Sequence, residues 1–124
     1  MNKSFPKKVK KVKRSTLKNK ADKLWSQTIR KVGVCMLSDD DDVRCGGVLQ
    51  AAHIIGRSNH ALRWDLQNGL CICSGHHRYY TSHPFYWNIL IENKFPNKYK
   101  YLVDHRNKIW DKDIQKVIDS LSAI

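Results

Sequence analysis

The sequence predicts an α+β fold in which a short β-hairpin is surrounded by helices. Apolar residues recur at helical spacing between Leu17 and Val32 and again beyond Pro84, whereas Val48–Ile55 is a mainly apolar run of strand length. A chain of 124 residues fits a single domain with a modest core, which a bound metal ion would help to stabilise.

The first helix is expected between Ser15 and Val32. Ser15 is placed to act as its N-cap, and Gly33 can end it in a left-handed conformation. Its basic residues should lie on the outer surface, where they form either an ordinary solvated face or a DNA contact; they are Lys18, Lys20, Lys23, Arg30 and Lys31.

The centre of the chain should form the hairpin. Val48–Ile55 is the expected first strand, Gly56–Gln67 the turn and second strand, and a further helix should begin near His76. The preceding segment, Cys35–Cys45, has the composition of a loop. Its four adjacent acids repel one another and are therefore expected to point into solvent; they are Asp39, Asp40, Asp41 and Asp42.

Beyond Pro84 the apolar spacing predicts helices that contribute to the core, with breaks near Pro96 and Asp111. The aromatic residues of these stripes could instead stack on nucleobases, but helical spacing favours packing.

The positive charge is concentrated at the N-terminus. Residues 1–31 contain 12 Lys or Arg and one acid (12 − 1 = +11), whereas residues 32–124 contain 11 basic and 10 acidic residues (11 − 10 = +1). Residues 1–14 are expected to form a disordered basic arm ahead of a domain over residues 15–124. Such an arm suits non-specific binding to the phosphate backbone of DNA, the expected partner; a solubilising or nuclear-import tail is the alternative.

The cysteines favour metal binding over disulfides. The sequence has no secretory signal and no apolar stretch long enough to cross a bilayer, so a soluble, cytoplasmic protein without membrane association is expected. In that compartment cysteine beside histidine at short spacing indicates a structural zinc site.

A histidine, an asparagine and a second histidine stand at a spacing suited to phosphodiester hydrolysis. His53 lies in the apolar run, Asn68 follows in a polar turn, and His77 lies nine residues later. A neutral imidazole can activate water at pH 7. This pattern resembles the HNH endonucleases, a family with a ββα-metal fold of two short strands and one helix around a divalent ion.

The resemblance extends over roughly residues 15–90. KNKADKLWSQTIRKVGVC, CGGVLQAAHIIGR and ALRWDLQNGLCICSGHH look like a phage-associated branch of the family, similar to the recombination endonucleases of lambdoid phages. It implies that His53 is the general base, that Asn68 holds the loop and that base in register, and that His77 binds the catalytic ion. Mg²⁺ or another divalent ion such as Mn²⁺ would then stabilise the departing 3′ oxygen, leaving a 5′ phosphate and a 3′ hydroxyl.

The resemblance also points to the zinc ligands. Aligning on Asn68 and His77 places His76 where relatives have a cysteine, so the expected set is Cys35, Cys45, Cys73 and His76. Cys71 is then a spare thiol; otherwise it replaces Cys73.

One departure affects the catalytic ion. Many HNH proteins carry an Asp or His ligand immediately before the general base, where this chain has Ala52. His83, six residues after His77, is the candidate for an extra ligand, and a surface histidine before Pro84 is the alternative.

Three arginines flank the expected site and could bind DNA phosphates, namely Arg57, Arg63 and Arg78. For Arg63, which precedes Trp64 and Asp65, an internal salt bridge with Asp65 is the alternative. The function expected is therefore metal-dependent hydrolysis of DNA by nicking or double-strand cleavage, in a host cytoplasm if the protein is phage-encoded. A zinc-stabilised nucleic-acid-binding module without cleavage and an RNA-directed nuclease are the competing interpretations.

Overall fold

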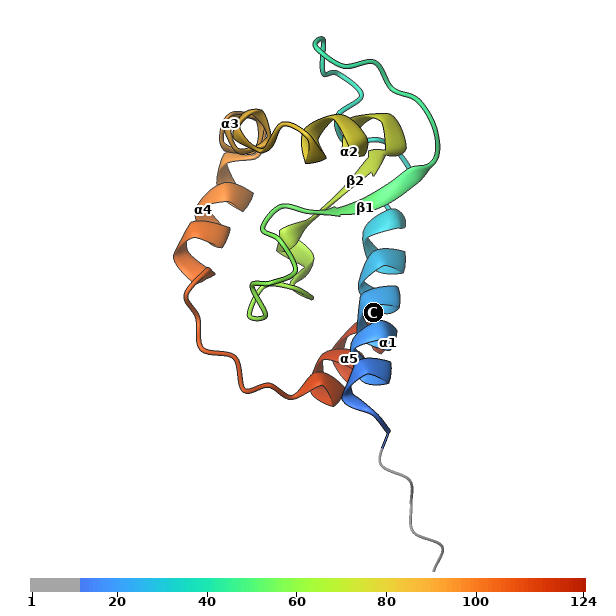
Figure 1. The fold of residues 1–124 in the computed structure, drawn as a ribbon, viewed down its shortest axis with the longest axis vertical. Coiled ribbons are helices and arrows are strands. Elements are labelled where there is room, and N and C mark those ends of the chain that lie inside the picture. Colours follow the sequence, from blue (N-terminus) through green and yellow to red (C-terminus); the bar gives the residue numbers. More distant parts are fainter. Residues whose placement is uncertain (1–11) are drawn as a thin grey trace, which may run out of the picture.

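The computed structural model describes residues 12–124, which form a two-stranded sheet enclosed by helices (Figure 1). The expected α+β class is confirmed. In chain order the elements are α1 (Arg14–Arg30), β1 (Leu49–His53), the 3₁₀ turn η1 (Leu66–Asn68), β2 (Gly69–Cys73), α2 (Ser74–Thr81), α3 (Pro84–Lys94), α4 (Pro96–His105) and α5 (Ile114–Ser122).

The two strands pair antiparallel, with Leu49 opposite Cys73 and His53 opposite Gly69. All five residues of β2 are buried, because helices cover both faces of the hairpin. Since side chains alternate between the faces of a strand, β2 supplies apolar groups to two separate clusters.

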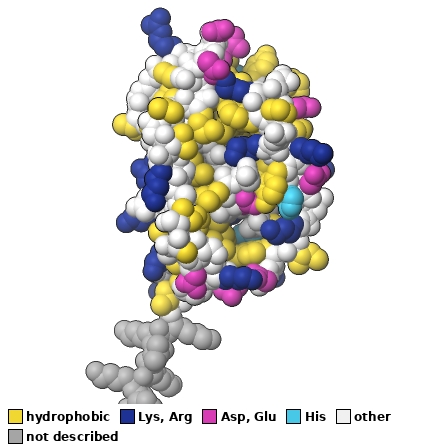
Figure 2. All heavy atoms as spheres, turned by 180° about the vertical axis from the view of Figure 1, so that it is seen from behind, with side chains coloured by type: hydrophobic (Ala, Val, Ile, Leu, Met, Phe, Trp, Pro, Cys, Tyr) yellow, Lys and Arg dark blue, Asp and Glu magenta, His cyan; other side chains and the backbone are white. Residues whose placement is uncertain are grey.

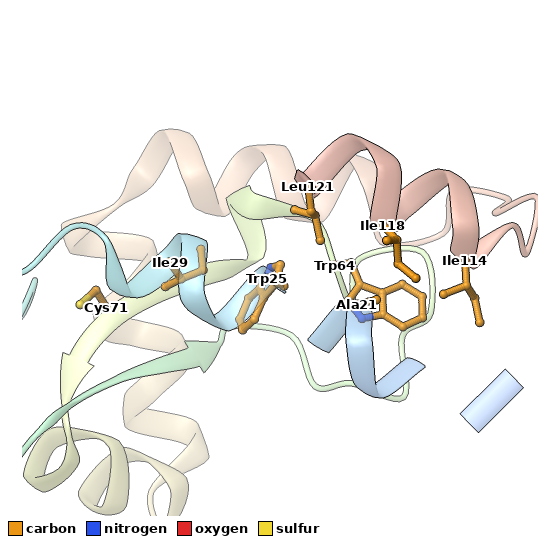
Figure 3. Close-up of a cluster of buried hydrophobic side chains, with 8 residues drawn as sticks. All are labelled: Ala21, Trp25, Ile29, Trp64, Cys71, Ile114, Ile118 and Leu121. Carbon is orange, nitrogen blue, oxygen red and sulfur yellow. The ribbon is translucent and has the colours of Figure 1, made fainter. Parts of the chain in front are cut away.

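One cluster lies between the hairpin, α1 and α5. Figure 3 shows Ile114, Ile118 and Leu121 of α5 pointing toward the side chains of α1 and toward Trp64, with Cys71 of β2 at the far end. The other cluster packs Ala52, Leu70 and Ile72 of the hairpin against α2 and α3.

Gly69 allows α1 to approach the hairpin closely. A Cβ atom there would lie 2.5 Å from Ile29 Cδ1 and 2.7 Å from Trp25 Cζ2. Because His53 is the strand partner of Gly69, this contact brings α1 directly against the end of β1.

Several local expectations were wrong. The second strand is Gly69–Cys73, whereas most of residues 56–67 form turns. The helix starts at Arg14 with Lys13 as N-cap, so Ser15 is already helical. Arg14 donates to the carbonyl of Lys112 at 3.1 Å, which ties the first helical residue to the segment before α5.

Other expectations are met. Gly33 has a φ of 78° beyond the end of α1, and the C-terminal helices break at Phe95 and again after His105. Of the basic arm, residues 1–11 lie outside the described residues. From residue 12 onward, no helix is both long enough and apolar enough to span a membrane.

Candidate active site and metal centre

His53 and His77 line the same cavity, of about 290 Å³, although they come from different elements. His53 is the last residue of β1, and His77 lies in the first turn of α2. Ala52, Ile72 and Trp87 form part of the apolar wall. The hairpin and the following helix therefore bring two imidazoles to one partly enclosed space.

The ring of His53 is held on two sides. Its Nε2 lies 2.8 Å from the backbone oxygen of Arg63, and its face stacks on Trp25 with ring centroids 3.9 Å apart and planes 10° from parallel. A carbonyl can only accept, so Nε2 carries the proton and Nδ1 retains its lone pair. Burial lowers the pKa of His53 from the usual 6.5. His53 is therefore neutral at pH 7 and can accept a proton through Nδ1.

The carbonyl that binds His53 is itself fixed through Asp22. The Asp22 carboxylate accepts hydrogen bonds from Arg63 Nε at 3.0 Å and Nη2 at 2.7 Å, and from Trp64 Nε1 at 2.8 Å. Arg57 Nη1 lies 3.6 Å from the same carboxylate. An aspartate of α1 thus holds the loop whose backbone orients His53.

Sequence reasoning missed Asp22 and Trp25. Asp22 is the sole acid among residues 1–31 and stands three residues before Trp25, so both share one face of a helix. That isolated acid beside an aromatic residue was the available signal. Arg63 forms an internal salt bridge, but with the distant Asp22 rather than with the expected Asp65, and its side chain is only 13% exposed.

Asn68 joins both ends of the loop that follows β1. It is fully buried; its Oδ1 accepts from Ile55 N at 2.7 Å, and its Nδ2 donates to the carbonyls of Ile55 at 2.9 Å and Leu62 at 3.1 Å. Three hydrogen bonds from one buried amide fix the path of the chain just beyond His53.

His77 presents one nitrogen as a possible ligand. Its Nδ1 lies 2.7 Å from Gln50 Oε1, so Nδ1 donates and Nε2 keeps a lone pair. Burial lowers the pKa of His77 as well, which favours the neutral form that can bind a metal ion.

A second group of side chains has the composition and spacing of a zinc site. One ligand atom from each of Cys35, Cys45, Cys73 and His76 lies within 4.8 Å of every other. The sulfurs lie 3.7, 3.7 and 3.0 Å from His76 Nδ1. Tetrahedral Zn²⁺ with ordinary bond lengths requires S···N separations of about 3.5 Å, so this Cys3His group fits zinc.

Backbone donors around Cys73 support a thiolate. Gly46 N and His76 N lie 3.4 and 3.5 Å from its sulfur. Burial opposes ionisation, but these N–H groups and the side chain of His76 outweigh it and lower the pKa of Cys73 to about 6.

The other nitrogen of His76 faces Asp40. His76 Nε2 is buried and has no hydrogen-bond partner among residues 12–124, and Asp40 Oδ2 lies 3.5 Å away. Asp40 also accepts a hydrogen bond of 2.6 Å from Tyr80, and its side chain is 5% exposed. The expectation that all four acids point into solvent is therefore wrong for Asp40. A carboxylate behind a histidine ligand is a common support of metal sites.

A comparison with protein families matches the segment that contains these residues. Residues 34–86 match the family model described as HNH endonuclease. The matched segment supports assignment to the HNH family and contains both cavity histidines, Asn68 and the whole Cys3His group. Neither the search of curated proteins nor the search of solved structures returned a match.

Two other expected site residues, His83 and Cys71, lie outside the cavity of His53 and His77. His83 is absent from its lining; its Nδ1 binds the carbonyl of Tyr79 at 2.7 Å, and its ring stacks on Tyr79. Cys71 is buried in the α1–α5 cluster, outside the Cys3His group. Arg78 is exposed on α2.

Proposed function

We propose that this protein is a metal-dependent HNH endonuclease that hydrolyses phosphodiester bonds of DNA, and that β1, β2 and α2 form its ββα-metal core. The observation that carries the proposal is the shared cavity of His53 and His77 inside the segment that matches the HNH family. The excess of basic residues, +12 at pH 7, favours a polyanionic substrate.

His53 acts as the general base. Its Nδ1 accepts the proton of a water molecule as that water attacks phosphorus, and the Arg63 carbonyl stabilises the imidazolium through Nε2–H. Trp25 and the Asp22–Arg63 pair keep the ring and the carbonyl in place, and Asn68 keeps the loop closed. These contacts fix the base before the reaction, so little reorganisation accompanies the proton transfer.

His77 supplies a ligand for the catalytic ion. When bound, Mg²⁺ or Mn²⁺ provides Lewis-acid stabilisation of the negative charge that develops on the phosphate and the leaving oxygen. Ala52 offers no ligand atom and His83 does not line the cavity, so substrate phosphate and water would complete the coordination.

Zinc in the Cys3His group serves stability. Zinc held by this group would join the loop after α1 to the junction of β2 and α2, and would thereby fix the helix that carries His77. Arg57, with a side chain 63% exposed, and Arg78 are the proposed phosphate contacts beside the cavity. A phage origin and a host-cytoplasmic location are proposed from the resemblance alone.

The decisive experiment compares His53→Ala with His105→Ala, which removes an imidazole outside the cavity. His53→Ala should reduce DNA cleavage by about 10² to 10⁴-fold while zinc content and DNA affinity stay near wild type. His105→Ala should cleave normally. Undiminished cleavage by His53→Ala would remove this residue from the mechanism.

Substrates and metals should be varied in the same assay. The proposal requires wild-type cleavage of DNA that stops on chelation and returns with Mg²⁺ or Mn²⁺. Cleavage confined to RNA would favour the RNA-directed nuclease. Tight nucleic-acid binding without cleavage under any metal would favour the binding module.

A further inference from the structure

A second pocket, whose cationic residues all lie outside the segment that matches the HNH family, collects positive charge. It has a volume of about 660 Å³ and is formed by the start of α1, the loop 58–61 and the linker 106–112. Its five cationic side chains are Arg14, Lys18, Arg106, Lys108 and Lys112. Figure 2 shows Lys and Arg side chains along both sides of one face of the molecule, with apolar groups between them.

The cations of this pocket have no close ionic partner in the described part of the chain. No carboxylate lines the pocket, and none of its five cations takes part in an ion pair within residues 12–124. By contrast, Lys94 and Lys116 each pair with an aspartate. Five unpaired cations around one concave surface favour the binding of a polyanion.

The pocket also offers aromatic surface. The rings of His60 and Trp110 have centroids 6.1 Å apart and planes only 3° from parallel. Trp110 is anchored against Trp64 of the core cluster, and the Arg14 guanidinium lies 5.8 Å from its centroid. Parallel aromatic faces beside cations suit a nucleobase with adjacent phosphates.

The pocket is connected to the cavity of His53 through one short loop. Gly56 lines that cavity, and Ser58 to Ala61 line the basic pocket. Asn59 Nδ2 donates to the carbonyl of Arg106 at 2.9 Å, so the loop is tied to the linker. Four residues span at most about 14 Å. One nucleic-acid strand can therefore reach from the basic pocket to the cavity of His53 over a few nucleotides.

We propose that the basic pocket binds an unpaired stretch of the nucleic-acid strand whose phosphodiester is cleaved at His53. The cations contact its phosphates, and His60 and Trp110 stack on one base. Base faces are accessible to side chains only where the base is unpaired, so the site favours substrates with a single-stranded segment beside the cleaved bond. This inference rests on the proposed function and specifies its substrate.

The test measures binding of a fluorescent single-stranded DNA by anisotropy at several salt concentrations. Arg106→Ala/Lys108→Ala should flatten the slope of log affinity against log salt by about 1.4, which is about 0.7 for each lost contact. Lys23→Ala/Lys100→Ala removes the same charge from exposed sites outside the pocket and should change the slope much less. The proposal would be overturned if the pocket variant had the same salt slope as wild type. It would also be overturned if the pocket variant and the control variant had the same slope.

Stacking is tested with His60→Ala, which alters an exposed side chain. Affinity for the single strand should fall by about fivefold or more, whereas an oligonucleotide with abasic sites should bind wild type and variant alike. Equal weakening on both oligonucleotides would refute the base contact. Wild-type protein that binds no single strand would refute the whole site.

Cleavage by the wild-type protein separates the two proposals. If the wild-type protein cleaves DNA and the pocket variants bind it normally, the endonuclease proposal stands and the binding role of the pocket is refuted. If binding depends on the pocket but the wild-type protein does not cleave DNA, the pocket remains a binding site and the endonuclease proposal is refuted.

Discussion

Asp22 links α1 to the loop behind His53, so its removal should affect both stability and catalysis. Asp22→Ala deletes the acceptor of the bidentate pair with Arg63 and of the Trp64 indole. The side chains of Arg63 and Asp22 are 13% and 22% exposed. Truncation therefore leaves a mostly buried guanidinium without its charged partner.

The expected decrease in the free energy of unfolding of Asp22→Ala lies between two limits. Removing one partner of a fully buried pair costs about 3–5 kcal/mol, whereas a hydrogen bond to a charged group contributes about 1.5–3 kcal/mol. Partial exposure places Asp22→Ala at about 2–4 kcal/mol in the free energy of unfolding, which lowers Tm by roughly 3–6 °C for each kcal/mol in a domain of this size. The released Arg63 carbonyl should also lower kcat at temperatures where the variant is folded.

Denaturant unfolding measures the stability change, with Asp111→Ala as the matched control. Asp111 pairs with Lys116, but these side chains are 55% and 72% exposed. Such an exposed surface pair contributes little to stability. A loss for Asp22→Ala no larger than that for Asp111→Ala would refute the role given to Asp22.

The pH dependence gives an independent check. Burial raises the pKa of Asp22, but hydrogen bonds from Arg63 and Trp64 and the nearby arginine charges outweigh it, so the pKa is below the usual 3.8. The stabilisation is therefore complete above pH 3.8 and is lost as the pH falls through the lower folded-state pKa. The difference in the free energy of unfolding between wild type and Asp22→Ala should therefore become smaller as the pH falls over that acidic range.

Four further outcomes are expected. Cys73→Ser should lower zinc content by elemental analysis and unfold or aggregate the protein, and folded wild type without zinc would contradict the metal assignment. Asn68→Ala should lower the free energy of unfolding by about 2–4 kcal/mol, because it leaves buried backbone groups unpaired; chemical denaturation measures this. Cleavage should depend on neutral His53 and reach its plateau near or below pH 6.5, since burial lowers the pKa of this base; a rise centred well above that value would argue against it. Deleting residues 1–11 should flatten the salt dependence of duplex binding by about 0.9 per lost contact without reducing kcat.

The sequence pattern located helices well because their apolar stripes are long. The second strand was misplaced for a physical reason. Residues 69–73 are buried on both faces and show no alternation, whereas residues 56–67 carry polar and apolar residues in turns that tertiary contacts hold. The burial of this strand on both faces depends on helices that are far away in the sequence. The local spacing of apolar residues carries no information about such distant packing.

The candidate metal ligands were accessible to sequence reasoning because they lie in short motifs with known chemistry. The supporting groups were not. Asp40 stood in a run of four acids that composition alone assigns to solvent, and only the folded loop places it behind His76 and against Tyr80. Likewise, Trp25 and Asp22 contact His53 and Arg63 across roughly 30 to 40 residues of sequence.

Contacts that support His53 also come from outside the segment that matches the HNH family. The HNH match covers residues 34–86, yet the ring that stacks on His53 and the carboxylate that fixes its carbonyl partner both belong to α1. The close approach of α1 at Gly69 means that this helix packs directly on the end of β1. Without α1, His53 would lose one face of its environment and would become more hydrated, which would raise its pKa and loosen its orientation. The proposed base therefore depends on a helix outside the matched segment. Residues 34–86 by themselves would retain the proposed metal ligands but would lack the contacts from α1 that hold the ring of His53 in place.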